Sequence, residues 1–254
     1  MMPRTEIEAL ARTNRTNPYF QEKHYLMSLI LSSLYSRTKR QLVFKGGTYL
    51  WFFHRLPRAS EDLDFTAVGE VGMGPLIEGV VADLAIYGLG AIHRIEKSRE
   101  SFTAKVAVEG PLFDGRNRNT IRIEVNLRGD VEREPVFLAF KSPYSDAPDF
   151  SLLGMDLEEV LAEKVRAMVW RRRARDLFDI HHLLAMGVKV DMELIIGKLR
   201  YYDIKPSPKL LEDAIDEIGG VWRAELSPLI KGPRPDFKTA AGAVKARLGS
   251  FDQG

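Results

Sequence analysis

Two aspartates, Asp62 and Asp64, are the residues of this sequence with the clearest capacity for chemistry. They belong to the segment Asp62-Leu63-Asp64-Phe65-Thr66, which reads as a strand, and side chains two residues apart on a strand point to the same face. Like charges placed in this way repel each other unless a cation lies between them, and Mg²⁺ prefers such oxygen ligands together with substrate phosphates. The pair indicates either a metal site for phosphoryl transfer or a solvent-exposed strand end.

A glycine turn, Lys45-Gly46-Gly47-Thr48, precedes the aspartates, between a predicted strand at Leu42-Val43-Phe44 and a predicted helix. Glycines let the backbone approach a phosphate, the first turn of a helix offers free N–H groups, and the Thr48 hydroxyl can add a donor. The spacing of a P-loop is missing. Such turns are common by themselves, but next to Asp62 and Asp64 this one favours a nucleotide site.

A third carboxylate, Glu124, is the leading candidate to complete a metal site. It lies in the alternating segment 120–127, where Ile121, Ile123 and Val125 face one way and the polar residues face the other. The alternative is that Glu124 pairs with a nearby arginine, Arg122 or Arg128. The sequence leaves both interpretations open.

A second group of charged residues surrounds Lys164, in the predicted helix from Leu157 to Trp170. Lys164 falls within the apolar stripe of that helix, so its ammonium group must extend to solvent or meet an anion. The following segment, Arg171-Arg172-Arg173-Ala174-Arg175-Asp176, concentrates positive charge, which is ordinary at a helix C-terminus but also suits nucleotide or RNA phosphates. Asp176 and Asp179 share a helix face, and Arg175 can pair with Asp179 at i,i+4.

These two regions resemble the two conserved motifs of the AbiEii-type nucleotidyltransferase toxins. The first match runs from Lys45-Gly46-Gly47-Thr48 to Arg58-Ala59-Ser60-Glu61-Asp62-Leu63-Asp64-Phe65, and the second joins Leu161-Ala162-Glu163-Lys164 to Arg175-Asp176-Leu177-Phe178-Asp179. The family includes the mycobacterial MenT enzymes and belongs to the DNA polymerase beta-like nucleotidyltransferase superfamily. Its members are toxins of abortive-infection and type IV-like toxin–antitoxin systems.

The resemblance implies a role for each matching residue. The implied catalytic residues are Asp62, Asp64, Lys164 and Asp176, with Asp179 in support. The implied nucleotide-binding residues are Gly46, Gly47, Thr48, Arg58, Ser60 and Arg171, and Lys105 is a further candidate for contact with a phosphate. The implied metal ligands are Asp62 and Asp64, which would hold Mg²⁺, or Mn²⁺ in its place. Glu124 has no clear match in the family's motifs and is the candidate third ligand from its position in the strand alone. One departure from many relatives is that the glycine turn ends in Thr rather than Ser.

The elements that must position these residues change in character along the chain. Helices and strands alternate at first, several strands follow, and from about Asp156 onward the pattern is helical. This order predicts an α+β fold, with a mixed-sheet nucleotidyltransferase lobe at 1–150 and an α-helical lobe at 151–254. Pro143 and Pro148 mark the expected boundary.

Composition narrows the classes of protein further. The 254 residues carry a formal net charge of +2 and include no cysteine, which excludes disulfides, thiolate metal sites and a cysteine nucleophile. No stretch approaches the roughly 18 apolar residues that a membrane span needs. We expect a cytoplasmic protein that does not contact a membrane.

The expected activity is transfer of a nucleoside monophosphate from an NTP to an acceptor hydroxyl. By resemblance the acceptor is the 3′ end of a tRNA, and a cognate antitoxin is an expected partner. A nucleotidyltransferase that modifies a protein is one alternative, and a non-catalytic nucleotide- or RNA-binding relative is another. The first two share every catalytic residue, so the sequence does not separate them, whereas the presence of both motifs disfavours the third.

Overall fold

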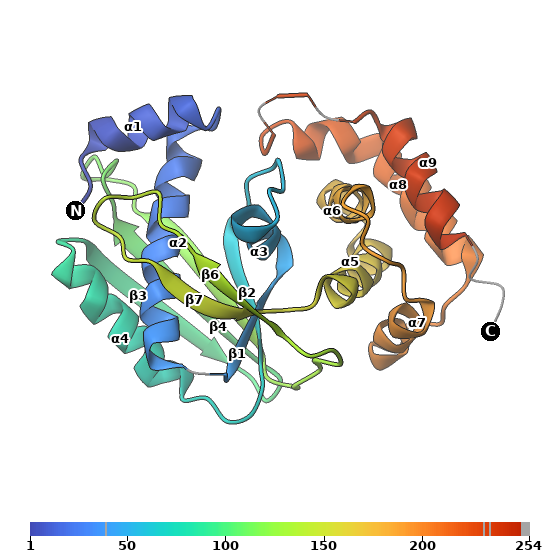
Figure 1. Ribbon diagram of the computed structural model, residues 1–254, viewed down its shortest axis with the longest axis horizontal. Coiled ribbons are helices and arrows are strands. Elements are labelled where there is room, and N and C mark those ends of the chain that lie inside the picture. Colours follow the sequence, from blue (N-terminus) through green and yellow to red (C-terminus); the bar gives the residue numbers. More distant parts are fainter. Residues whose placement is uncertain (39, 231, 234, 250–254) are drawn as a thin grey trace. The chain divides into compact units, whose positions relative to one another are not determined.

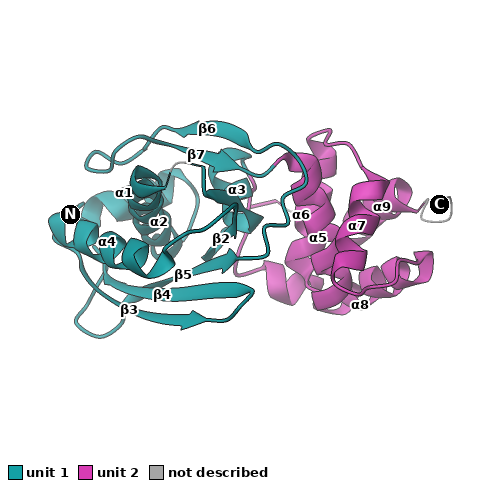
Figure 2. Cartoon of the chain, turned by 90° about the horizontal axis from the view of Figure 1, so that it is seen from below, with its two compact units in different colours: residues 1–55, 59–155 teal, residues 56–58, 156–254 magenta. Residues whose placement is uncertain are grey.

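The computed structural model describes residues 1–38, 40–230, 232–233 and 235–249, and the chain divides into two compact units. Unit 1 comprises Met1–Arg55 and Ala59–Met155, and unit 2 comprises Leu56–Arg58 and Asp156–Gly254 (Figure 2). The division falls after Met155 rather than after residue 150, because residues 150–154 form a strand of unit 1. Residues 250–254, which the predicted helical lobe includes, lie outside the described residues.

Unit 1 contains a mixed sheet and the helices that cover it (Figure 1). Its helices are α1 (Arg4–Thr13), α2 (Pro18–Arg37), α3 (Gly46–Phe53) and α4 (Met73–Ile86). Its strands are β1 (Leu42–Lys45), β2 (Asp62–Ala67), β3 (Gly90–Lys97), β4 (Ser101–Glu109), β5 (Asn119–Asn126), β6 (Val136–Phe140) and β7 (Phe150–Gly154). The sequence patterns did not predict helix α1 or strands β3 and β7.

The strands of the described residues form one seven-stranded sheet in the order β3-β4-β5-β2-β1-β7-β6. The pairs β1–β7 and β2–β5 are parallel, and the other neighbouring strands are antiparallel. The predicted α+β class with a mixed sheet is confirmed. The parallel pair β2–β5 matters most for the site, because it places the strand of Asp62 and Asp64 directly beside the strand of Glu124.

Strands β2, β4 and β5 have one apolar face and one mainly polar face. Helix α2 packs against β5 and β7, and α4 packs against β3 and β4 (Figure 1). The buried side chains of this region alternate along the strands, and they include Leu63, Phe65, Ala104, Val106, Ile121, Ile123 and Val125. Because successive residues of a strand point to opposite faces, the intervening polar residues all lie on the other face. That face carries the predicted site.

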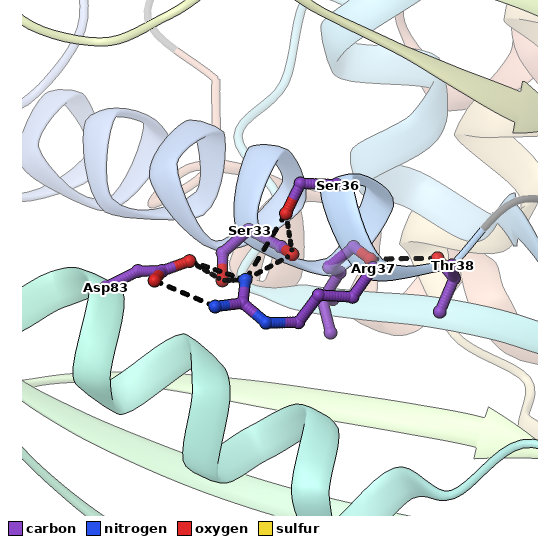
Figure 3. Close-up of polar contacts among 6 residues, drawn as sticks. Ser33, Ser36, Arg37, Thr38 and Asp83 are labelled. Atoms are coloured by element: carbon purple, nitrogen blue, oxygen red, sulfur yellow. Dashed lines mark hydrogen bonds and ion pairs between the residues drawn. The ribbon is translucent and has the colours of Figure 1, made fainter.

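An arginine joins the two helices α2 and α4 (Figure 3). The Arg37 guanidinium donates to both carboxylate oxygens of Asp83 on α4, and Asp83 also accepts from the Ser33 hydroxyl at 2.7 Å. The hydrogen bond from Arg37 holds the pKa of Asp83 below its ordinary value. Gly79 leaves room for this arrangement, since a Cβ there would lie 2.6 Å from Arg37 Nε.

Aromatic rings hold the short helix α3 in place. The Phe52 ring stacks on His24 of α2 with ring centroids 3.9 Å apart, and His24 Nδ1 lies 2.7 Å from the Tyr144 hydroxyl. Burial lowers the pKa of His24 to about 3, so this ring is neutral. Tyr49 lies against Gly154 of β7, where a Cβ would come within 2.4 Å of the tyrosine ring. These contacts fix the helix that begins at the glycine turn.

Unit 2 is helical in the part that the structure describes. Its helices are α5 (Leu157–Arg171), α6 (Ala174–Ala185), α7 (Met192–Tyr201), α8 (Pro208–Leu226) and α9 (Phe237–Leu248). The side chain of Asp156 caps α5 by accepting from the backbone N–H groups of Glu158 and Glu159. No helix among the described residues of either unit has the length and apolar character to span a membrane.

A buried ion pair connects α7 to α5, the helix that carries Lys164. The Lys198 Nζ atom lies 2.6 Å from Glu159 Oε1, and the side chains are 1% and 0% exposed. A buried charge is not solvated by water, so its burial is costly unless a group of opposite charge lies beside it. This pair therefore fixes how α7 packs against α5.

We predict that Lys198→Met destabilises the protein by about 3–5 kcal/mol, because it leaves the Glu159 carboxylate buried without its ammonium partner. Urea denaturation measures the change. The double variant Lys198→Met/Glu159→Met is expected to regain most of the lost stability, since neither charge remains. Arg4→Met, which removes the exposed pair Arg4–Glu8, serves as the control and should change stability little. A double variant no more stable than the single one would contradict the assignment.

Candidate functional site

Asp62 and Asp64 lie on one face of β2, as the alternation predicts, and both are half-buried. The sheet register gives each aspartate defined neighbours. Asp64 stands opposite Lys45 of β1 on one side and Glu124 of β5 on the other, and Asp62 stands opposite Arg122 of β5. Paired residues of adjacent strands project to the same side of a sheet, so all of these side chains share the polar face.

The backbone of Gly46 lies close to the Asp64 carboxylate. Its φ of +78° lies in the left-handed region that glycine adopts readily. A Cβ added to Gly46 would lie 2.3 Å from Asp64 Oδ2, closer than real atoms come. The turn therefore needs glycine for two reasons, its backbone conformation and its contact with a carboxylate. As a result, the N-terminus of α3 begins directly beside Asp64.

Thr48 has a different role from the one its position in the motif suggested. Its side chain is fully buried, and its hydroxyl donates a hydrogen bond to the Asp62 carbonyl oxygen. The expectation that this hydroxyl adds a donor for a phosphate is not supported, because it is directed at the protein. Thr48 instead ties the first turn of α3 to the start of β2. In this geometry an anion would be bound by the backbone N–H groups of Gly46 and Gly47 rather than by the Thr48 hydroxyl.

Glu124, the proposed third metal ligand, contacts its neighbour on β5. Its Oε1 atom lies 2.7 Å from Arg122 Nε, with side chains 38% and 47% exposed. Within the described part of the chain, no three acidic or histidine side chains lie close enough together to hold a metal ion. The role of Glu124 as a ligand stays a prediction, and it would require the carboxylate to leave Arg122.

Asp62 and Asp64 by themselves have the chemistry of a magnesium site that is completed by substrate. Mg²⁺ is commonly held by one or two carboxylates, and phosphate oxygens and water supply the remaining ligands. Two half-buried carboxylates on one face, beside free N–H groups at a helix start, match that requirement. Mn²⁺ accepts the same oxygen ligands.

In unit 2, Lys164 meets anions rather than extending to solvent. Its Nζ atom lies 2.7 Å from Asp179 Oδ2 and 3.3 Å from Asp176 Oδ1, and its side chain is 9% exposed. Arg58 donates to both oxygens of Asp179, from Nε and Nη2, at 2.6 Å each. Arg171 Nη2 lies 3.2 Å from Asp176 Oδ1. We call these five residues the buried ionic cluster.

This cluster corrects one sequence-based alternative. The i,i+4 partner proposed for Asp179 was Arg175, but the partners that the structure records are Arg58 and Lys164. Arg175 is exposed. Burial raises the pKa of Asp179, yet the charges of Arg58 and Lys164 outweigh this effect, so that pKa lies below its ordinary value of 3.8. The Asp179 carboxylate is ionised and holds the two cations in place.

The buried ionic cluster carries one more positive than negative charge, since three cations face two carboxylates. Asp176 contributes a further feature. It is fully buried, and its Oδ2 atom accepts no hydrogen bond from the described residues. A buried acceptor left without a donor costs about 1–3 kcal/mol, so it is well suited to receive a donor group from a ligand.

Part of the basic segment after α5 is used within unit 2. Arg172 pairs with Glu217, and Arg173 Nη1 lies 2.7 Å from Glu225 Oε1, both on α8. Glu225 also accepts from the backbone N–H of Ala174. These arginines therefore help to pack α8 near the start of α6. Arg171, which is 46% exposed, is the member of the segment that joins the buried ionic cluster.

The predicted residues thus fall into two groups. Unit 1 holds the glycine turn, the two aspartates, Glu124, Lys105 and the half-buried Ser60, and unit 2 holds Arg58, Lys164, Arg171, Asp176 and Asp179. The structure adds Lys45, which the motif contained but to which no role was given. Its register position opposite Asp64 makes it a candidate site residue. Only the antiparallel pairing of β1 with β2 could have indicated this.

Comparison with known proteins gives matches over most of the chain. Residues 30–243 match a family model described as the nucleotidyl transferase AbiEii toxin of type IV toxin–antitoxin systems. The structure is similar to MenT4, a nucleotidyltransferase toxin from Mycobacterium tuberculosis, with a TM-score of 0.67 and 18% identity over 100% of this chain and 91% of that chain. It is also similar to JHP933 from Helicobacter pylori, with a TM-score of 0.59 and 21% identity over 89% of each chain. No curated protein matches by sequence.

We predict that Gly46→Ala lowers the site's activity by about 100-fold, because the added methyl group must displace the Asp64 carboxylate. Gly69→Ala is the matched control. Gly69 follows β2 and has a φ of +90°, but a Cβ there has nothing within 4 Å. Both variants should lose stability in thermal unfolding because of the positive φ, and Gly46→Ala should lose more because of the clash with Asp64. Only Gly46→Ala should lose activity under conditions where both variants are folded. Equal activity losses in the two would contradict the proposed contact.

We predict that Arg58→Met destabilises the protein by about 3–5 kcal/mol near pH 7, because Asp179 loses its bidentate partner. A carboxylate with a lowered folded pKa stabilises above its ordinary pKa, and this contribution is lost as the pH falls through the folded pKa. The stability difference between wild type and Arg58→Met should therefore narrow below about pH 4. Urea denaturation across pH measures it, with Arg175→Met as the exposed control. A difference independent of pH would exclude this role.

Proposed function

Because the chain belongs to the AbiEii family of nucleotidyltransferase toxins, we propose that it transfers the nucleoside monophosphate of an NTP to a hydroxyl at the 3′ end of a tRNA. The observation that carries this proposal is the close approach of Gly46 to Asp64 on the polar face of β2. It brings the Asp64 carboxylate, with Asp62 on the same face of β2, next to the start of helix α3. Phosphoryl transfer depends mainly on positioning and electrostatic stabilisation of this kind.

Asp62 and Asp64 are proposed to hold Mg²⁺, or Mn²⁺ in its place, against the triphosphate. When bound, the metal ion would neutralise the charge that develops on the phosphate oxygens. Asp62 and Asp64 would determine the position of the metal ion and therefore which phosphate oxygens it contacts. The N–H groups of Gly46 and Gly47 are proposed to hold a phosphate oxygen of the same nucleotide.

The proposed reaction balances as a substitution at the α-phosphorus. The acceptor hydroxyl oxygen forms a bond to the α-phosphorus, the bond from that phosphorus to the bridging oxygen of the β-phosphate breaks, and pyrophosphate leaves. The hydroxyl proton passes to a base. Asp176 Oδ2, a buried oxygen that accepts no hydrogen bond from the described residues, is the proposed acceptor of a substrate hydrogen bond in this reaction.

The buried ionic cluster is proposed to supply positive charge for the nucleotide. Its formal excess of one positive charge resides on side chains that carboxylates hold firmly, so little conformational entropy is lost on binding a phosphate. Lys164 and the partly exposed Arg171 are the proposed phosphate contacts. Arg58 acts through Asp179, by holding it where it orients Lys164. Arg58 is therefore proposed as a positioning residue rather than as a direct nucleotide ligand.

Family membership also supports a cognate antitoxin as partner, and growth arrest as the result of unrestrained activity. Co-expression tests this part of the proposal. Cells that produce the wild-type chain should stop growing, and a neighbouring antitoxin gene should restore growth. A chain that never impairs growth in any host would contradict it.

We predict that Asp64→Asn lowers nucleotidyl transfer by at least about 100-fold, because it removes a charged ligand of the proposed metal site. The assay incubates each α-labelled NTP with Mg²⁺ and either total tRNA or cell lysate, and follows label in RNA and in protein. The control Asp149→Asn makes the same chemical change at an exposed carboxylate paired with Lys141, and it should leave transfer intact.

Label in tRNA supports the proposed acceptor, whereas label in protein would replace it with a protein-modifying activity. A wild-type chain that binds NTP but transfers no label to either acceptor would contradict the proposed function. Removal of divalent metal with EDTA should abolish transfer, and Mg²⁺ or Mn²⁺ should restore it. Full transfer in EDTA would exclude the metal site.

A further inference from the structure

A row of basic side chains crosses the polar face of the sheet and ends at Asp62. The register pairs Arg94 of β3 with Lys105 of β4, Lys105 with Arg122 of β5, and Arg122 with Asp62 of β2. Residues paired in this way project to the same side of the sheet. The four side chains therefore stand in line across four adjacent strands, and we call Arg94, Lys105 and Arg122 the basic row.

The basic row is open to solvent. The side chains of Arg94 and Arg122 are 79% and 47% exposed, and Lys105 is exposed as well. The face beside the row also carries Ile92, an apolar side chain that is 58% exposed. Ile92 stands two residues from Arg94 on β3, hence on the same face.

Two carboxylates neighbour the row. Arg94 Nε lies 3.5 Å from Glu96 Oε1, and Arg122 Nε lies 2.7 Å from Glu124 Oε1. Ion pairs between exposed groups are weak and easily exchanged, so a phosphate can replace either carboxylate. Within the described part of the chain, no acidic side chain forms an ion pair with Lys105. The row thus keeps net positive charge at its centre.

We propose that the basic row binds the phosphodiester backbone of a single-stranded RNA acceptor and leads its end to Asp62. Adjacent strands lie about 4.8 Å apart, so the row and Asp62 together span roughly 14 Å. This length suits a short run of consecutive phosphates along a single strand. Ile92 offers an apolar contact for a base or ribose beside the phosphates.

This proposal rests on the proposed nucleotidyl transfer, to which it adds the surface that holds the acceptor. The regular spacing of the charges and their alignment with a catalytic carboxylate favour a polyanion with a repeating backbone. An acidic peptide could also pair with these positive charges. It has no reacting 3′ end, however, that must lie beside Asp62 at the end of the row. The polar face of the sheet would then bind the RNA strand, while the turn at Gly46 binds the nucleotide.

The test uses the double variant Arg94→Ala/Lys105→Ala of the full chain and a fluorescent single-stranded RNA of 12 nucleotides. Arg122 is kept because it contacts Glu124 beside the proposed metal site. The matched control is Lys97→Ala/Arg99→Ala, which also removes two exposed positive charges. Lys97 pairs with the buried Phe102 and so lies on the opposite face of β3, and Arg99 lies in the following turn.

Fluorescence anisotropy over a range of salt concentrations measures RNA affinity. We expect the double variant to raise the Kd about tenfold at low salt and to lower the slope of log K against log salt by about 1.4, or about 0.7 for each lost phosphate contact. RNAs of two nucleotides should bind the wild type and the variant equally weakly. Calorimetry should give the same Kd for NTP in both, because the proposal assigns Lys105 to the RNA backbone and not to the nucleotide.

An unchanged salt slope, or an equal loss of affinity in the control, would overturn the proposal. So would a parallel loss of NTP affinity, because the row would then belong to the nucleotide site. Displacement of RNA by the control polyanion polyglutamate at equal charge concentration would indicate an acidic protein acceptor instead, and would also overturn it. If the wild-type chain binds RNA through the basic row but transfers no nucleotide, the proposed nucleotidyl transfer is contradicted and the RNA-binding surface is not.

Discussion

The contact between Gly46 and Asp64 is the constraint on which the arrangement of unit 1 depends. Because the glycine has no Cβ, the chain turns from β1 into α3 immediately beside a carboxylate of β2. The buried hydroxyl of Thr48 then fixes the first turn of α3 to Asp62, and Tyr49 packs that helix against Gly154 of β7. A negatively charged group and the positive end of a helix are thereby held together. A triphosphate with its metal ion has the matching charges.

Charge compensation plays the corresponding role in unit 2. A lysine in the apolar stripe of a helix is costly unless an anion accompanies it, and Lys164 has two, Asp176 and Asp179. Asp179 is itself buried, and the two 2.6 Å hydrogen bonds from Arg58 help to keep it ionised. The short segment 56–58 belongs to unit 2 because of contacts such as this one. Stability and the proposed phosphate-binding role therefore depend on the same group of charges.

The central sheet of unit 1 separates the tasks of folding and chemistry between its two faces. Alternation along β4 and β5 buries the apolar residues on the side where α2 and α4 pack, and that burial supplies the stability. The alternate residues, which point to the opposite face, do not contribute to this core. They include the residues of the basic row, and the two aspartates lie on the same face. Substitutions on the polar face should for this reason change binding and activity more than stability. MenT4 has a similar fold at 18% identity, which is consistent with the fold depending on pattern more than on individual residues.

The sequence by itself determined the features that depend on a few neighbouring residues. Period-two alternation placed Asp62 and Asp64 on one face, and the glycine turn indicated a close backbone approach. Helical periodicity showed that Lys164 must either reach solvent or meet an anion. The order of elements also predicted the α+β class. Only the tertiary structure decided which anions Lys164 meets, and that Arg58 rather than Arg175 holds Asp179. Arg58 and Asp179 are 121 residues apart, and their pairing depends on how distant segments pack together, which no local pattern of the sequence encodes.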